Sequence, residues 1–101
     1  MAALHTMHVI TRRELNKFAL RYPDAKSGLA DWGRIMKRDV FENFAELRAL
    51  FPSAYKVGKL TVFNIGGNKY RIIAAVHYNR KRIYIRAVLT HEEYNKGKWK
   101  E

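Results

Sequence analysis

Residues 62–94, VFNIGGNKYRIIAAVHYNRKRIYIRAVLTHEEY, decide the fold of this chain, because apolar and polar side chains alternate along them between short turn sequences. Alternating runs rich in β-branched and aromatic residues are typical of strands, and they predict strands over residues 60–65, 68–78 and 82–89. The Gly66-Gly67 pair and the segment 79–81 favour hairpin turns between these strands. The region therefore predicts a three-stranded antiparallel meander.

The residues before this meander have helical spacing. Apolar side chains recur three and four positions apart over residues 12–22. Thr11 with Glu14 has the pattern of a capping box, in which a hydroxyl and a carboxylate bond the free amides of a helix start. Pro23 ends this first helix, and Asp24 is expected to cap a second helix with a similar apolar stripe. Two amphipathic helices are therefore predicted before the meander.

Shorter segments complete the predicted order. Residues 7–10 indicate a first strand, residues 41–51 predict one or two loose helical turns, and residues 53–59 have the composition of a polar connector. We thus expect an α+β fold of order β-α-α-β-β-β, with an antiparallel sheet and the two N-terminal helices packed on one face. A chain of 101 residues has the length of one domain, which we place at residues 7–101. Residues 1–6 have no pattern that could pack, and we regard them as an extension that need not be native.

Side-chain parity separates the predicted sheet into an apolar and a basic face. A two-residue turn at Arg80-Lys81 pairs the even-numbered apolar residues of the central strand with the odd-numbered apolar residues of the last strand. A turn one residue longer would mix arginines with core residues, and burying those charges would be costly. The helices need the apolar face, so the other face stays open and carries four side chains: Lys69, Arg71, Tyr84 and Arg86.

The charge balance favours a polyanionic partner. Lys and Arg number 20 against 9 Asp and Glu, which gives a formal net charge of +11. Such a surface attracts nucleic acid, although a solvated basic surface that only keeps the protein in solution is the alternative. No apolar run is long enough to span a membrane, and the basic residues form no single amphipathic face. We expect a cytoplasmic protein.

Cysteine and histidine usage narrows the chemistry. The chain has no cysteine, which excludes disulfides and thiolate catalysis. Its four histidines have none of the spacings of a zinc or metal-nuclease site. We therefore expect no metal centre and no cofactor.

The segment after the last predicted strand, Thr90-His91-Glu92-Glu93-Tyr94, brings a histidine next to the basic face. Thr90 and Glu93 form a second capping box, which by itself explains only a short helix start. His91 takes the first helical position, and imidazole as a chemical group, with an unperturbed pKa of ~6.5, suits proton transfer at neutral pH. Tyr94 lies one turn on, on the same side. An exposed surface histidine is the simpler alternative, and the neighbouring arginines favour the catalytic interpretation.

Two motifs and a short N-terminal sequence carry a resemblance to a known family. N-x-G-G-N-x-x-R over residues 64–71, I-R-x-V-x-T-H-x-E-Y over residues 85–94 and an early MHVIT resemble the HigB family of bacterial toxins, within the RelE-type ribonuclease-toxin superfamily. The resemblance extends from Met7 to about Tyr94. It implies the toxin of a type II toxin–antitoxin system, an mRNA interferase that cleaves translated mRNA, on the ribosome or free of it, and inhibits translation.

The resemblance also implies partners and a site. The expected partners are mRNA, the ribosome and a cognate helix-turn-helix antitoxin of the HigA type, through which the toxin–antitoxin complex binds operator DNA. Carried onto this sequence, the two motifs give these candidate site residues: Asn68, Arg71, Arg86, His91 and Tyr94.

A metal-independent endoribonuclease mechanism follows as a hypothesis. His91 takes the proton from a ribose 2′-hydroxyl, which attacks the adjacent phosphorus, while Arg71 and Arg86 stabilise the charge on the phosphoryl oxygens. Tyr94 either protonates the leaving 5′-oxygen or orients the nucleotide. The products would be a 2′,3′-cyclic phosphate and a 5′-hydroxyl. RNA contacts are expected at five residues, with the tyrosine as a candidate base-stacking ring: Lys59, Asn68, Lys69, Arg82 and Tyr84.

Two other functions fit the same residues. A non-catalytic module that binds RNA or DNA with its basic face would show salt-sensitive binding without cleavage. A protein-interaction domain whose basic face is wrapped by an acidic antitoxin segment would be harmless when it is free in cells.

Overall fold

The described part of the chain, residues 7–100 of a computed structural model, is a mixed α+β fold whose centre is the predicted meander. The predicted extension at residues 1–6 lies outside this part. No helix within residues 7–100 is long and apolar enough to cross a membrane. Strands, helices and two short 3-10 turns (η) follow one another in this order: β1 (His8–Ile10), α1 (Arg13–Arg21), η1 (Pro23–Ala25), α2 (Lys26–Arg38), α3 (Phe44–Leu50), β2 (Tyr55–Val57), β3 (Leu60–Ile65), β4 (Tyr70–His77), β5 (Arg82–Thr90), α4 (His91–Lys96) and η2 (Lys98–Lys100).

Five strands form one sheet in the order β1-β5-β4-β3-β2. The predicted meander is confirmed: β3, β4 and β5 pair antiparallel, with Asn64 and Leu89 on either side of Arg71. β1 instead pairs with β5 in parallel, and His8 lies opposite Arg82. The expectation of a wholly antiparallel sheet is therefore wrong. Parallel neighbours need a long crossover connection, and the chain between β1 and β5 supplies it because both long helices lie there.

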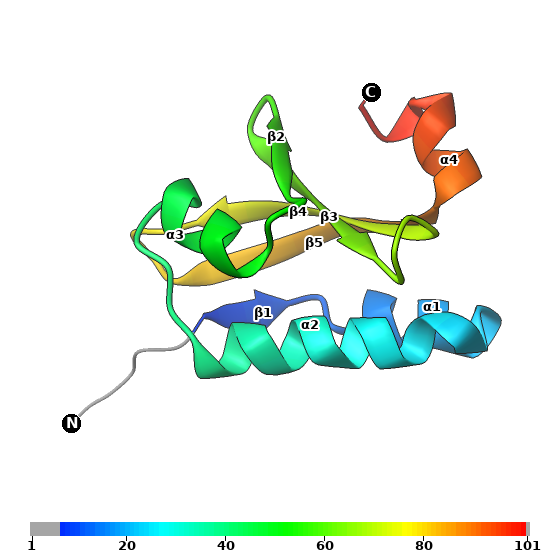
Figure 1. The fold of residues 1–101 in the computed structure, drawn as a ribbon, viewed down its shortest axis with the longest axis horizontal. Coiled ribbons are helices and arrows are strands. Elements are labelled where there is room, and N and C mark those ends of the chain that lie inside the picture. The colour runs from blue at the N-terminus through cyan, green and yellow to red at the C-terminus, as the bar shows by residue number, and fades with distance from the viewer. Residues whose placement is uncertain (1–6, 101) are drawn as a thin grey trace.

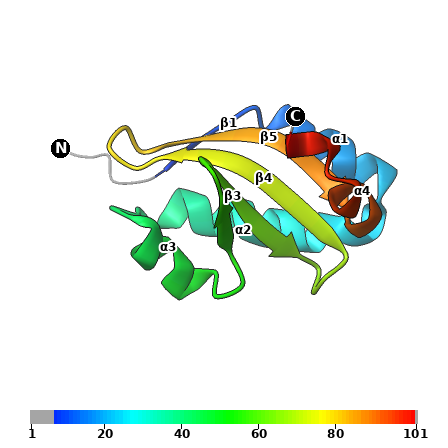
Figure 2. The same cartoon turned by 90° about the horizontal axis from the view of Figure 1, so that it is seen from above.

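α1 and α2 lie side by side against one face of the sheet, and β2 and α4 rise from the other (Figure 1, Figure 2). The hydrophobic core fills the space between these helices and the sheet, where Trp32 and Met36 of α2 are buried with Phe63, Ile72 and Ile83 of the strands. Trp32 meets Phe63 edge to face at 5.4 Å between ring centroids, which is a favourable aromatic geometry. β2 and α4 lie on the opposite side of the sheet from this core.

Both predicted caps of the first two helices are wrong. Thr11 has a left-handed backbone with φ 68°, and its hydroxyl donates to the carbonyl oxygen of Ile10 and, at 3.3 Å, to that of Ile85. The hydroxyl thus ties the end of β1 to β5, and α1 begins without a side-chain cap. Asp24 lies in η1, where its carboxylate accepts a hydrogen bond from the Tyr70 hydroxyl at 2.6 Å. In both cases a contact with the sheet replaces the local one.

The segment predicted as a polar connector contains an edge strand. β2 pairs antiparallel with β3 across a tight turn in which Gly58 has φ 61°, a conformation that favours glycine. Three residues are too few for an alternating pattern to be recognised. The helical turns predicted over residues 41–51 are confirmed as α3, which Asn43 caps by accepting from the Glu46 amide at 2.9 Å.

The turn between β4 and β5 and a bulge within β5 revise the predicted faces. Four residues, 78–81, separate the paired His77 and Arg82, where a two-residue turn was predicted. The longer turn keeps the parity of the pairing, so the apolar residues of both strands share one face up to the bulge. Beyond the bulge the parity changes, and Ala87 and Leu89 lie on the opposite face. A β-bulge further along leaves Arg86 without a partner on β4. Such a bulge interrupts the alternation and changes the direction of nearby side chains.

Candidate active site

Arg71 is the centre of the site. Along β4 it alternates with the core residues Tyr70 and Ile72, so its side chain projects from the face opposite α1 and α2. Only 5% of Arg71 is exposed, and a charge buried this far is stable only when its donors are bonded. Nη1 donates to the carbonyl oxygens of Asn68 at 3.1 Å and Tyr70 at 3.2 Å, and Nη2 donates to the Asn68 side-chain oxygen at 3.2 Å. The β3–β4 turn therefore fixes the guanidinium.

His91 contacts the same guanidinium from the start of α4. Arg71 Nη2 lies 3.1 Å from His91 Nδ1. Because arginine keeps its protons, Nδ1 must accept this bond, and Nε2 then holds the ring proton. The predicted capping box of Thr90 and Glu93 is confirmed by hydrogen bonds of 2.9 and 3.1 Å, and the His91 amide donates to the Lys69 carbonyl at 2.8 Å. The capping box and the bond to the β3–β4 turn together hold the exposed His91 imidazole against the buried Arg71 guanidinium.

Tyr94 and Tyr55 close the site on its other side. The guanidinium carbon of Arg71 lies 5.1 Å from the centroid of the Tyr94 ring, which is a cation–π contact. The Tyr94 and Tyr55 hydroxyls are hydrogen-bonded, and the two rings meet nearly at right angles. Burial, and after it the bond to Tyr55, raise the pKa of Tyr94 to about 12. The phenol therefore stays protonated at neutral pH, as a proton donor must.

Tyr55 is the site residue that sequence reasoning missed. It belongs to β2, inside the segment predicted as a polar connector. The available signal was the triplet Tyr55-Lys56-Val57 before Gly58, which fits a strand entering a tight turn. A triplet of this composition fits a loop equally well, and only the pairing with β3 distinguishes the two.

Three predicted residues at the turns and the bulge do not join this cluster. Lys69 lies in the β3–β4 turn, and its Nζ is 3.6 Å from the Asp24 carboxylate in the helix layer. Its assignment to the same face as Arg71 is therefore wrong. Arg86 is exposed at the bulge, outside the alternation that placed it beside Arg71. Lys59 is exposed in the turn between β2 and β3.

Tyr84 and Arg82 lie far along β5 from the site. Tyr84 is opposite Ala75, four residues along β4 from Arg71 and so roughly 13 Å away. Its ring contacts the His77 ring edge-on at 5.0 Å, and Arg82 is opposite His77. Tyr84 shares the open face of the sheet with Arg71, as predicted, but it lies outside the cluster around Arg71.

The structure thus brings together groups that can hold an anion and move protons: a fixed guanidinium, an imidazole and a protonated phenol. Within residues 7–100, no group of three or more His, Asp or Glu side chains is close enough to hold a metal ion. The cluster contains four predicted residues and one that was missed: Asn68, Arg71, His91, Tyr94 and Tyr55.

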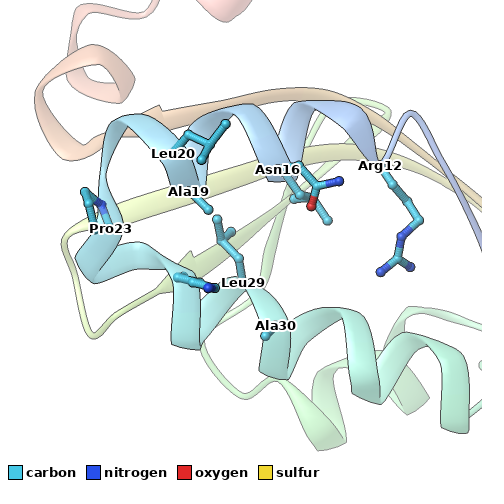
Figure 3. A pocket seen from close by; sticks show the side chains of 9 residues that line it. Arg12, Asn16, Ala19, Leu20, Pro23, Leu29 and Ala30 are labelled. Carbon is cyan, nitrogen blue, oxygen red and sulfur yellow. The ribbon is translucent and has the colours of Figure 1, made fainter.

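A separate groove of about 550 Å³ runs between α1 and α2 (Figure 3). Its lining is mostly apolar, and Leu20 on its edge is 84% exposed. Arg12 and Lys26 also line it. The groove belongs to the helix layer, on the other side of the sheet from Arg71, and it forms no part of the site.

Comparison with known proteins identifies the family. Residues 25–97 match the HigB toxin family model, described as a RelE-like toxic component of a toxin–antitoxin system. The chain is 39% identical over 92 residues to the mRNA interferase toxin HigB of Escherichia coli K12, covering 88% of each chain. The mRNA interferase HigB of Escherichia coli O6:H1 is 31% identical over 94 residues, covering 89% of this chain and 90% of that protein. The resemblance in the two sequence motifs is confirmed, and the chain belongs to the HigB family of RelE-like toxins of toxin–antitoxin systems.

Proposed function

We propose that this protein is the toxin of a type II toxin–antitoxin system and acts as an endoribonuclease that cleaves mRNA and so inhibits translation. Relatives that match it over most of its length are named mRNA interferases, and a net charge of +11 suits an RNA substrate. The observation that carries the proposal is the buried Arg71 in contact with both His91 and Tyr94. These are the groups that a metal-independent phosphodiester cleavage requires.

Arg71 stabilises the charge that develops on the phosphoryl oxygens. Its guanidinium is already desolvated and fixed by three bonds to the β3–β4 turn, so little reorganisation is needed when the charge appears. An electrostatic contact in such a site is stronger than the same contact in water. Arg86, exposed on β5, supplies a second cation to the bound RNA.

His91 is the general base. In the free protein its Nδ1 lone pair accepts a hydrogen bond from Arg71 Nη2. A phosphate is a better acceptor for a guanidinium than an imidazole is, so a bound phosphodiester draws Nη2 away and frees Nδ1. Nδ1 then takes the proton of the ribose 2′-hydroxyl, the 2′-oxygen bonds to phosphorus, and the imidazole becomes imidazolium. Substrate binding itself thus uncovers the base.

Tyr94 is the general acid. The bond from phosphorus to the 5′-oxygen breaks as the Tyr94 hydroxyl gives its proton to that oxygen, and the hydrogen bond to Tyr55 holds the Tyr94 ring in position. The raised pKa of Tyr94 keeps this proton in place at neutral pH until the leaving oxygen needs it. The products are a 2′,3′-cyclic phosphate and a 5′-hydroxyl, and two side chains perform both proton transfers.

The remaining predicted contacts serve the RNA strand and the partners. Asn68 holds Arg71 and stands exposed at the edge of the site. Basic side chains further away, at Lys59, Lys69 and Arg82, attract the RNA backbone. Translated mRNA on the ribosome is the proposed substrate. A helix-turn-helix antitoxin of the HigA type neutralises the toxin in the cytoplasm, and the complex binds operator DNA through the antitoxin.

Purified protein tests this proposal directly. Wild type, His91→Ala and the control His77→Ala are incubated with an mRNA, once on translating ribosomes in Mg²⁺ and once without ribosomes in EDTA, and the product ends are determined. We expect internal cuts with 5′-hydroxyl ends from wild type and His77→Ala, and no cuts from His91→Ala. His77 is a matched control because it is exposed at the far end of β4. RNA binding without cleavage by wild type would instead support the non-catalytic module.

A further inference from the structure

The C-terminal turn η2 places a tryptophan on the candidate site. Gly97 has φ 75° and ends α4, so the chain reverses direction there. The Trp99 ring then stacks on the Tyr94 ring, with 4.9 Å between centroids and 16° between planes. The Trp99 indole nitrogen donates to the Tyr94 carbonyl oxygen at 2.9 Å. Stacking and hydrogen bond together hold the indole in one orientation.

The stack is continuous with the guanidinium that holds the phosphate. Tyr94 contacts Arg71, at 5.1 Å from its ring centroid, and it contacts Trp99 at 4.9 Å. Trp99 is half-buried, and Lys100 Nζ lies 5.7 Å from its ring centroid. Lys98 and Lys100 are both exposed. An aromatic ring that is partly open to solvent and flanked by cations is typical of sites for single-stranded nucleic acid.

We infer that the indole of Trp99 is a binding site for a nucleobase of the RNA, next to the phosphodiester that Arg71 engages. The inference rests on the proposed ribonuclease function for the identity of the ligand. A base stacks on the part of the indole that is not covered by Tyr94, and the ammonium groups of Lys98 and Lys100 pair with flanking phosphates. Every base has a π-face, so the contact adds affinity with little preference for sequence.

A purely structural role for Trp99 predicts different behaviour. If the indole only covers Tyr94, its replacement changes the catalytic group and lowers kcat, and the RNA concentration that half-saturates the enzyme stays the same. A base-stacking role affects KM instead. One stacked base corresponds to ~5–150-fold in affinity, so Trp99→Leu should raise KM by that factor with a smaller change in kcat. Trp99→Phe keeps a stacking ring and should stay within about threefold of wild type.

Tryptophan fluorescence reports the stacking without any cleavage. The chain has two tryptophans, and Trp32 is buried in the core with 1% exposed, so Trp32→Phe leaves Trp99 as the only tryptophan, which is excited selectively at wavelengths that tyrosine does not absorb. The probe is a 2′-O-methyl RNA oligonucleotide, which lacks the attacking hydroxyl, and its abasic counterpart provides the same phosphates without bases. We expect the oligonucleotide to quench the Trp99 fluorescence in a saturable way, and we expect the abasic chain to bind without quenching it. If Trp32→Phe does not fold, fluorescein-labelled oligonucleotide binding by Trp99→Leu and Trp99→Phe gives the same comparison.

The outcomes separate this inference from the proposed function. Cleavage by wild type without quenching of Trp99, or equal KM values for wild type and Trp99→Leu, would overturn the nucleobase site and leave the ribonuclease intact. No binding of the oligonucleotide to a folded, cleaving protein would overturn it as well. Quenching without any cleavage would support the nucleobase site and contradict the ribonuclease function.

Discussion

Replacing Arg71 by lysine tests the guanidinium itself, because the positive charge is kept and only its geometry is lost. Arg71 makes four hydrogen bonds from two nitrogens, to acceptors on Asn68, Tyr70 and His91. The single ammonium nitrogen of lysine cannot reach all the acceptors that the two terminal nitrogens of the guanidinium share, and we expect the lysine to keep about two of the four bonds. Bonds from a charged donor contribute about 1.5 kcal/mol or more each. The free energy of unfolding should fall by about 3 kcal/mol.

The effect of Arg71→Lys on cleavage should exceed its effect on RNA binding. Loss of one well-placed donor to the developing charge typically lowers the rate by about 10²–10³, whereas the unchanged net charge preserves the salt-dependent part of the affinity. Urea unfolding gives the stability, and single-turnover cleavage, measured where the variant is fully folded, gives the rate. Arg48→Lys is the control, because Arg48 is exposed on α3 and away from the site. Cleavage by folded Arg71→Lys within about threefold of wild type would refute the assigned role.

Four further changes test the site and the packing of the helix layer on the sheet. Tyr55→Phe removes the hydroxyl that is bonded to Tyr94, and the loss of one hydrogen bond should lower the single-turnover cleavage rate ~2–12-fold. Because this bond raises the pKa of Tyr94, the alkaline limb of the pH–rate profile should also move to lower pH. An unchanged profile would contradict the pairing of the two tyrosines. The pKa of Tyr70 is raised to about 12, because its hydroxyl donates to a carboxylate of the helix layer. The hydrogen bond between Tyr70 and this carboxylate stabilises the fold fully below pH 10, and its contribution is lost between pH 10 and 12 as the Tyr70 phenol ionises. Urea unfolding of Tyr70→Phe should therefore show lower stability than wild type at pH 8 and a shallower decline of stability above pH 10. Gly28→Ala places a methyl group 2.7 Å from a side chain of β3, and overpacking of about 1–3 kcal/mol outweighs the helix-propensity gain of about 1 kcal/mol. Gly33→Ala meets only a flexible guanidinium at 3.5 Å and should stabilise the protein; thermal unfolding of both variants distinguishes the two signs.

Sequence patterns predicted correctly those elements that are determined by interactions between residues close together in the chain. The alternation of residues 60–89 predicted the meander because β-branched residues and turn glycines act within a few positions. The Thr90–Glu93 capping box forms as predicted because no sheet contact competes for its hydroxyl. Its counterpart at Thr11 fails, because the hydroxyl there bonds β5 and the backbone takes a left-handed conformation. The same motif thus gives two outcomes, and tertiary contacts decide between them.

The site was predicted in part for a similar reason. Arg71, His91 and Tyr94 are brought together by one turn and one helix start, both visible in the sequence. Tyr55 arrives on an edge strand of three residues, which has too little pattern to recognise. The position of Arg86 outside the alternation of β5 depends on a bulge. Bulges follow from strand pairing in three dimensions, and parity along one strand carries no information about them.

Induced expression in bacteria, with RNA ends mapped across the transcriptome, tests the central claim most directly. Wild type and the control His77→Ala should arrest growth and produce new internal 5′-hydroxyl ends within coding sequences. His91→Ala, present at the same level and folded, should permit normal growth without those ends. Normal growth under wild-type expression, or arrest by His91→Ala with the same cuts, would contradict a ribonuclease toxin whose base is His91.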